Sequence, residues 1–182
     1  MEILDIVDEL GMPTGQTIER EKAHQLGILH RTSHVWIVRR KDKKLQILLQ
    51  KRSDNKDSYP GCYDISSAGH IPAGVDFIPS ALRELKEELG YDAKTEELID
   101  CGMRQFEFQK IFHNQLFHDH QISRIYALWL DQEPEMFTLQ KEEVSKVKWF
   151  DFDECFYLVK NNLIPHCIYL EELEMVKKKV AC

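Results

Sequence analysis

The segment from Gly69 to Tyr91 (GHIPAGVDFIPSALRELKEELGY) is the feature that most restricts what this chain can fold into. Its pattern predicts a helix over residues 76–89, because Asp76 is a suitable N-cap and Gly90 is a suitable terminator. One face of this helix can anchor it on a core, because that face carries Ala81, Leu82, Leu85 and Leu89.

Three glutamates share another face of the predicted helix. Glu84, Glu87 and Glu88 stand at positions i, i+3 and i+4, so their side chains point the same way. Like charges at this spacing destabilise an isolated helix by about 0.2–0.5 kcal/mol per pair, and Arg83 and Lys86 cannot neutralise all three. Carboxylate oxygens suit Mg²⁺ or Mn²⁺, which commonly bridge to substrate phosphates. The face is therefore a candidate metal site, and a solvated acidic surface is the alternative.

Most of the remaining chain is expected to form strands. A hairpin is predicted over 34–39 and 45–50, and further strands over 63–66, 97–109, 121–130 and 147–150. An N-terminal hairpin is predicted over 7–16, and helices over 18–26, 152–160 and 168–180. Asp151 and Glu154 have the spacing of a capping box. Strands in the middle with helices between and after them predict an α+β or α/β sandwich.

Composition and charge exclude several classes of protein. The chain of 182 residues is expected to form a single domain, 1–182. Its apolar runs are far shorter than the roughly 20 residues of a membrane span. The net charge of −7 argues against a nucleic-acid polymer as partner, although not against a small anionic substrate. The N-terminus, MEILDIVDEL, lacks the pattern of a secretory signal. The five cysteines contain no CxxC pair and are expected to be reduced thiols. Both observations predict a cytoplasmic location.

The same segment resembles the Nudix box of the Nudix hydrolase superfamily. That signature is Gly, five spacers, Glu, seven spacers, then Arg-Glu-aliphatic-x-Glu-Glu-x-Gly-aliphatic. The residues that match it are Gly69, Arg83, Glu84, Leu85, Glu87, Glu88 and Gly90. Val75 departs from it, because the signature has there a Glu that pairs with the helix Arg. Valine cannot accept a hydrogen bond, so Arg83 is expected to use Asp76 or a helix glutamate instead.

The resemblance implies a fold and a division of the chain. The fold would be the Nudix α/β/α sandwich, with a mixed central sheet and an N-terminal β-hairpin extension. Residues 1–28, approximately, would form the extension, residues 69–91 the loop–helix–loop of the box, and residues 168–182 a C-terminal helix. Gly69 and Gly90 would be structural glycines of the box. The oligomeric state stays open, a homodimer included.

The resemblance also implies an activity. A Nudix enzyme would hydrolyse a diphosphate linkage in a small nucleoside-diphosphate-like substrate, with Mg²⁺ or Mn²⁺ as cofactor. The metal ligands would be Glu84, Glu87, Glu88 and the backbone carbonyl of Ala68. Glu84 is the first candidate for the general base, and Arg83 would orient the glutamates. The base could instead come from Glu142–Glu143 or from the segment around Asp119.

A wider resemblance covers residues 4–159 approximately, to the Nudix branch related to isopentenyl-diphosphate isomerase. It rests on the order of motifs along the chain, among them LHRTS, LLQKRS, PGCYDISSAGH and WFDFDE. The isomerase carries a catalytic Cys directly before its Gly-His pair, where this chain has Ala68. A hydrolase is therefore favoured. The alternatives are an isomerase-like protein or a catalytically weak Nudix-fold ligand-binding module, for which Val75 is the one point in favour.

Histidines and aromatic residues leave further alternatives open. His24, His30 and His70 resemble the isomerase's metal-binding histidines, and they could hold an accessory metal or cap backbone groups. His30, His70 and Asp119 are also candidates for substrate contacts. A His-rich connection between two strands could bind metal or line the substrate mouth, and it contains His113, His118 and His120. Base stacking or core packing is open for Phe106, Phe108, Phe112 and Phe117.

Overall fold

The computed structural model describes residues 1–56, 58–112 and 114–181. The strands are β1 (Ile3–Val7), β2 (Pro13–Glu19), β3 (His30–Lys41), β4 (Lys44–Arg52), β5 (Tyr63–Asp64), β6 (Ser67–His70), β7 (Leu98–Phe112), β8 (Gln115–Trp129) and β9 (Val144–Asp151). The α-helices are α1 (Arg20–Leu26), α2 (Phe77–Leu89), α3 (Phe152–Lys160) and α4 (Leu170–Val180). Two short 3₁₀ helices are η1 (Thr95–Glu97) and η2 (Pro134–Met136).

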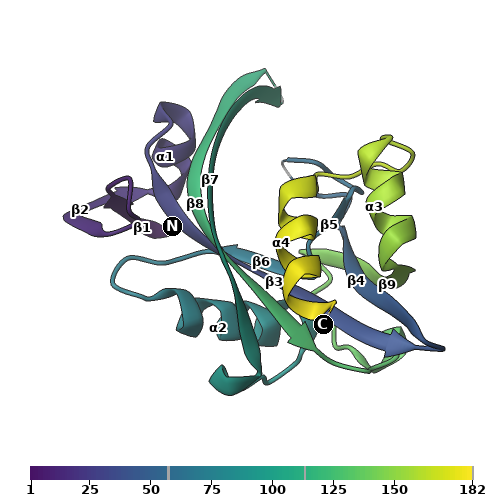
Figure 1. Cartoon of the computed structure of the whole chain (residues 1–182). Helices are drawn as coiled ribbons and strands as arrows, with labels where there is room; N and C mark the ends of the chain where they lie inside the picture. The colour runs from purple at the N-terminus through teal and green to yellow at the C-terminus, as the bar shows by residue number, and fades with distance from the viewer. Residues whose placement is uncertain (57, 113, 182) are drawn as a thin grey trace.

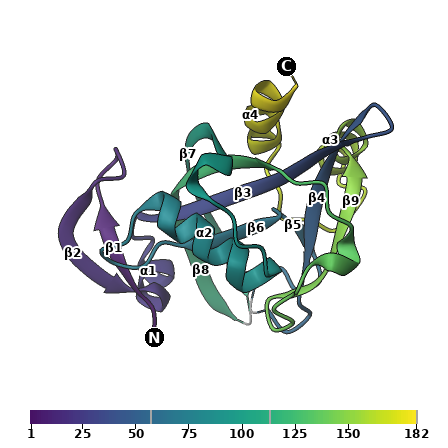
Figure 2. The same cartoon turned by 90° about the horizontal axis from the view of Figure 1, so that it is seen from below.

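A mixed seven-stranded sheet forms the centre of the fold. Its strand order is β5-β4-β3-β8-β7, with β6 also paired to β3 and β9 to β4. β3 and β8 run parallel, and the other pairs run antiparallel. Helix α2 covers one face of the sheet, and α3 and α4 cover the other (Figures 1 and 2). The predicted α/β sandwich with a mixed central sheet is therefore confirmed.

Alternation along β3 explains why the sheet has a core on each face. Val35 and Ile37 pack into the cluster that includes the apolar face of α2. Trp36 and Val38 pack into the cluster that includes α3 and α4. Because successive side chains of a strand point to opposite faces, a continuous apolar run is the expected sequence of a strand covered on both sides.

Helix α2 has the ends that its sequence predicts. The Asp76 side chain accepts a hydrogen bond from the backbone N of Phe77 at 2.7 Å. Gly90 ends the helix with φ +69°, and a Cβ there would lie 2.6 Å from Cβ of Thr138. Glycine is needed at this position for both reasons. In α3, Asp151 is the N-cap and accepts bonds from the two backbone N–H groups of Asp153 and Glu154.

The His-rich segment is part of a β-hairpin, so its prediction as a connection between strands was wrong. β7 and β8 are each 15 residues long and continue their pairing to Phe112 and Gln115. Every second residue of β7 from Phe106 is large or aromatic on one face, which is the period of a strand. The polar residues between them disguised this alternation. His113 lies outside the described residues.

The N-terminal extension forms the predicted hairpin. β1 and β2 pair antiparallel in a small sheet of their own, and α1 follows directly. Figure 1 shows this unit beside the end of the central sheet where α2 begins. No helix within the described ranges is long and apolar enough to cross a membrane.

Candidate functional site

One large cleft, of about 1680 Å³, brings together residues from most parts of the chain. Its walls come from α1, α2, β6, the segment after β4 and the hairpin arm of β7 and β8. Among the residues predicted for the site, those that line it are Ala68, Gly69, His70, Arg83, Glu84, Glu87, Glu88 and Asp119, together with His24 and the alternative bases Glu142 and Glu143. The cleft is therefore the place where the sequence-predicted residues meet.

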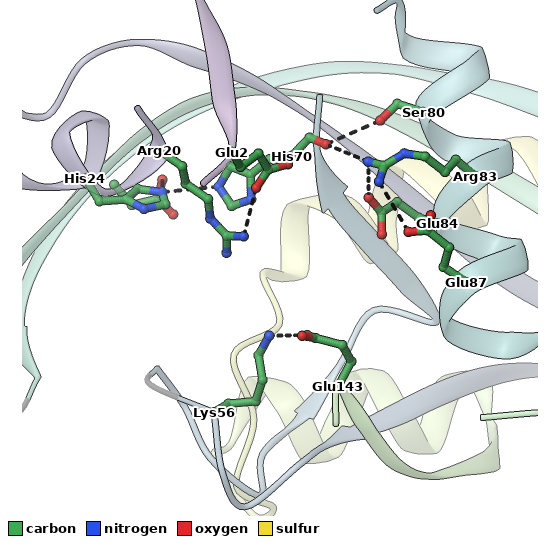
Figure 3. Close-up of polar contacts among 11 residues, drawn as sticks. Glu2, Arg20, His24, Lys56, His70, Ser80, Arg83, Glu84, Glu87 and Glu143 are labelled. Atoms are coloured by element: carbon green, nitrogen blue, oxygen red, sulfur yellow. Dashed lines mark hydrogen bonds and ion pairs between the residues drawn. The ribbon is translucent and has the colours of Figure 1, made fainter. Parts of the chain in front are cut away.

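Arg83 lies between two of the three box glutamates. Its Nη2 lies 2.5 Å from Oε1 of Glu84, and its Nη1 lies 3.2 Å from Oε2 of Glu87 (Figure 3). Nη2 also donates to the carbonyl oxygen of His70 at 3.4 Å. The expectation that Arg83 uses a helix glutamate in place of residue 75 is confirmed.

Two of the box glutamates, Glu84 and Glu88, are held in a poorly hydrated setting. Glu88 is 6% exposed, and one of its oxygens accepts a hydrogen bond from the backbone N of Ala68 at 3.2 Å. Burial raises the pKa of Glu88 to about 8. Burial also raises the pKa of Glu84 to about 7, against the opposing effect of Arg83. Carboxylates whose ionised form is disfavoured by burial gain most from a cation, so this face fits a metal with oxygen ligands.

Gly69 leaves room for the Glu84 side chain. A Cβ on Gly69 would lie 2.2 Å from Cδ of Glu84 and 2.3 Å from its Oε1. Only glycine lets the carboxylate of α2 approach β6 this closely. A side chain at residue 69 would therefore displace the Glu84 carboxylate from its present position.

Three histidines form a second cluster beside the box. Among the described residues, one group of His, Cys, Asp or Glu has ligand atoms all within 4.8 Å of one another: His24, His30 and His70. Asp119 Oδ1 lies 3.7 Å from Nε2 of His24 and 3.8 Å from Nε2 of His30. Nε2 of His30 and Oδ1 of Asp119 are buried and have no hydrogen-bond partner among residues 1–56, 58–112 and 114–181. Orphaned polar atoms of this kind mark a site that fits a cation.

The protonation of this cluster suits metal ligands. Burial lowers the pKa of His24 to about 3 and that of His30 to about 4, so both rings are neutral at pH 7. Nδ1 of His30 lies 2.8 Å from the carbonyl oxygen of Ile28 and can only donate to it, which leaves Nε2 as an acceptor. Burial raises the pKa of Asp119 to about 6. Neutral imidazoles with a carboxylate are typical ligands of transition metals.

Sequence reasoning missed the cations on the cleft walls. Arg20 lines the cleft and pairs with Glu2 at 3.0 Å, while Lys56 pairs with Glu143 across the cleft from the box (Figure 3). Arg52 lines it too. Arg52 and Lys56 lie at and just after the end of β4, far along the chain from Arg20, and no local pattern in the sequence marks the three as one set.

The aromatic residues of the hairpin arm line the cleft instead of a core. Those that do so are Phe106, Phe108, Phe112 and Phe117. Tyr59, in the segment after β4, also lines the cleft, and its ring centroid lies 5.1 Å from that of Phe112. Base stacking and core packing were both open for these residues from the sequence, and only Phe106 and Phe108 fell within the strand predicted over 97–109.

The comparison with protein families identifies the chain. Residues 29–167 match the NUDIX domain. This chain belongs to the Nudix family. It is therefore an enzyme of the Nudix pyrophosphohydrolase class, and the predicted membership of the Nudix superfamily is confirmed.

Two similar proteins carry the name Nudix hydrolase, and a third carries the name of an isomerase. An uncharacterized Nudix hydrolase of Clostridium acetobutylicum is 40% identical over 162 residues, covering 89% of this chain and 76% of that protein. Nudix hydrolase 3 of Arabidopsis thaliana is 40% identical over 163 residues, covering 84% of this chain but only 20% of that longer protein. An isopentenyl-diphosphate Delta-isomerase 2 of Photorhabdus laumondii is 29% identical over 172 residues, covering 94% and 90%.

Solved structures share the fold. A Deinococcus radiodurans protein has a TM-score of 0.68 at 18% identity, covering 98% of this Nudix chain and 99% of that one. The NUDIX domain of Shewanella oneidensis NrtR, complexed with ADP-ribose, has a TM-score of 0.59 at 16% identity, covering 82% and 87%. At these identities the likeness is evidence for the fold alone.

Proposed function

We propose that this Nudix protein is a Mg²⁺-dependent hydrolase that cleaves a diphosphate linkage in a small nucleoside-diphosphate-like molecule, with Mn²⁺ able to replace Mg²⁺. One observation carries the proposal: three glutamates of α2 face a large cleft, and burial raises the pKa of two of them. The Shewanella oneidensis domain of the same fold is complexed with ADP-ribose, which is a molecule of the proposed class. A cytoplasmic location belongs to the same proposal, and the four described cysteines are free thiols.

Each residue of the box has a proposed role. Glu84, Glu87, Glu88 and the backbone carbonyl of Ala68 would hold the metal. Bound there, the metal would neutralise diphosphate oxygens and lower the pKa of a bound water. Glu84 has a pKa of about 7, which suits a group that accepts a proton from water near neutral pH. Arg83 fixes the orientation of Glu84 through their 2.5 Å contact.

Other acids are alternative bases in the proposal. Glu143 lines the cleft but is paired with Lys56, so it would need to leave that lysine to accept a proton. Asp119 also lines the cleft, and its pKa is raised to about 6. Glu84 is preferred because it lies on the metal-binding face itself.

The cations of the cleft supply charge for the substrate. Arg20, Arg52 and Lys56 each pair with an acid, Glu2, Asp64 and Glu143 respectively. A diphosphate entering the cleft would meet these cations opposite the acidic face of α2. Arginine and lysine bind phosphate oxygens strongly because their hydrogen bonds are charge-assisted.

A substrate panel tests this function. Purified protein with Mg²⁺ at pH 8 is expected to release product from at least one nucleoside diphosphate linked to a second group. It is expected to leave isopentenyl diphosphate unisomerised, because Ala68 stands where the isomerase has its cysteine. Isomerisation by the wild-type chain would favour the isomerase alternative, and binding of panel members without turnover would favour the ligand-binding module.

We also propose that His24, His30, His70 and Asp119 form an accessory site for a transition metal. The two orphaned atoms, Nε2 of His30 and Oδ1 of Asp119, support it. Protein loaded with Zn²⁺ and then dialysed is expected to retain about one ion, and Asp119→Asn is expected to retain it 10- to 100-fold more weakly. Equal retention by wild type and Asp119→Asn would contradict the inclusion of Asp119.

A further inference from the structure

A buried ion pair ties the N-terminal hairpin to the core. Asp5 lies in β1 and Arg31 in β3, and Arg31 Nη2 lies 3.0 Å from Oδ2 of Asp5. Asp5 is 9% exposed and Arg31 6% exposed. A pair this well buried depends on further hydrogen bonds to hold its geometry. The loop before α2 supplies them, although the buried Nε of Arg31 has no partner among the described residues.

Both side chains bind the backbone of that loop, residues 71–76. The backbone N of Gly74 donates to Oδ2 of Asp5 at 2.9 Å. Arg31 Nη2 donates to the carbonyl oxygen of Val75 at 2.9 Å. One more bond joins the hairpin to the loop, from the backbone N of Ala73 to the carbonyl oxygen of Ile3 at 2.8 Å. The loop is thus held from the N-terminal side at three successive residues.

The loop leads directly into the metal-binding helix. Asp76 is the N-cap of α2, and its Oδ1 lies 3.9 Å from Nη1 of Arg31. The guanidinium of Arg31 also lies 5.3 Å from the ring centroid of Phe77, the first residue of α2. Arg31 therefore contacts the start of the helix whose next turns carry Arg83 and Glu84.

Asp5 and Arg31 hold the loop in a way that the side chain of Val75 cannot, because valine has no hydrogen-bonding group. In the Nudix signature a Glu at this position steadies the loop, whereas Val75 offers only its backbone. That backbone carbonyl is the group that Arg31 binds. We propose that Asp5 and Arg31 are positioning residues, which hold the loop before α2 so that Glu84, Glu87 and Glu88 present a metal site of fixed geometry. This inference rests on the proposed metal-binding role of the three glutamates.

Metal affinity separates positioning from simple stabilisation. The test uses Asp5→Ala and the conservative Asp5→Asn, which keeps an oxygen for Gly74. The matched control is Asp8→Ala. Asp8 belongs to the same hairpin and accepts bonds from the backbone N of Leu10 and of Met12, both at 2.9 Å. Within the described part of the chain Asp8 makes no hydrogen bond or ion pair with the loop, so its loss disturbs the hairpin alone.

Mn²⁺ binding is followed by electron paramagnetic resonance, well below the melting temperature of every variant. The Mn²⁺ ions bound at the box are identified as those that wild type binds and Glu87→Gln does not. Asp5→Ala is expected to bind them 10- to 100-fold more weakly, the usual effect of groups that orient metal ligands. Asp5→Asn is expected to fall between Asp5→Ala and wild type, and Asp8→Ala to match wild type.

Two outcomes overturn different claims. Wild-type Mn²⁺ affinity in folded Asp5→Ala, or in Asp5→Asn if the alanine variant does not fold, would overturn the positioning role. If Glu87→Gln binds as many Mn²⁺ ions as wild type, that result would instead overturn the proposed metal site. If Asp8→Ala weakens Mn²⁺ binding as much as Asp5→Ala does, the hairpin acts only through general stability. That result would also overturn the inference.

Val75→Glu adds a second test of the same idea. Val75 is partly exposed, so a Glu can be accommodated there without burying a charge. In the wild-type background the loop is already held, and the substitution is expected to change Mn²⁺ affinity little. In the Asp5→Ala background it is expected to restore part of the lost affinity. Equal effects in both backgrounds would contradict the coupling.

Discussion

Glu88→Gln is expected to lower turnover at least 100-fold and to raise the melting temperature of the metal-free protein at pH 9. Turnover falls because a metal ligand is lost, and metal stabilisation of transition-state charge is worth several kcal/mol, with about 1.4 kcal/mol for each factor of ten. Stability rises because Glu88 is 6% exposed and its pKa is about 8, so at pH 9 the native protein carries a buried negative charge. Glutamine keeps the shape and the acceptor for the backbone N of Ala68 without that charge.

Turnover and melting temperature of the same preparations check this expectation. Glu87→Gln is expected to lose turnover as well, but its side chain is 51% exposed, so no gain in melting temperature should accompany the loss. Glu96→Gln is the matched control, because Glu96 is an exposed acid of η1 away from the cleft. Wild-type turnover in both Glu87→Gln and Glu88→Gln would contradict the metal assignment.

The pH dependence of stability has an expected sign. The pKa of Glu84 is about 7 and that of Glu88 about 8 in the native protein, against 4.5 for an ordinary Glu. Between pH 4.5 and pH 8 the native state therefore holds protons that the unfolded state has released. Stability from these two groups is present at low pH and is lost as the pH rises through this window. Added Mg²⁺ is expected to reverse the loss, because it binds the ionised carboxylates.

Melting temperatures at pH 5, 7 and 9 measure this effect. His24 and His30 act in the opposite direction, because their lowered pKa values cost stability as the pH falls below 6.5. The difference between wild type and Glu88→Gln removes their contribution. That difference is expected to be near zero at pH 5 and to grow toward pH 9. A difference that is constant with pH, or that reverses sign, would be inconsistent with a raised pKa at Glu88.

Local features of the sequence predicted the fold well where one segment decides the outcome. Asp76 and Gly90 set the two ends of α2 because a cap and a left-handed glycine act within one turn of the helix. The end of β7 was placed too early, because strand length depends on the partner strand. Lys110, one residue past the predicted end, is in a strand because it pairs with Phe117, and nothing within the segment itself reveals that partner.

In the site, too, some residues could be predicted from the sequence and others could not. The three box glutamates could be found by helical spacing, and the histidines by resemblance. Arg20, Lys56 and the Asp5–Arg31 pair could not be found in either way. Asp5 and Arg31 are 26 residues apart, and their contact exists only after the N-terminal hairpin has packed beside β3. Contacts between distant segments carry no signal in the local pattern of one chain.

The position of a bound metal tests the central claim most directly. Crystals grown with Mn²⁺ can be examined for the anomalous scattering of manganese. The account predicts a peak within coordination distance of the Glu84, Glu87 and Glu88 carboxylates, with Arg83 displaced from at least one of them. A Mn²⁺ peak at the histidine cluster alone, with Arg83 still paired to Glu84 and Glu87, would contradict it.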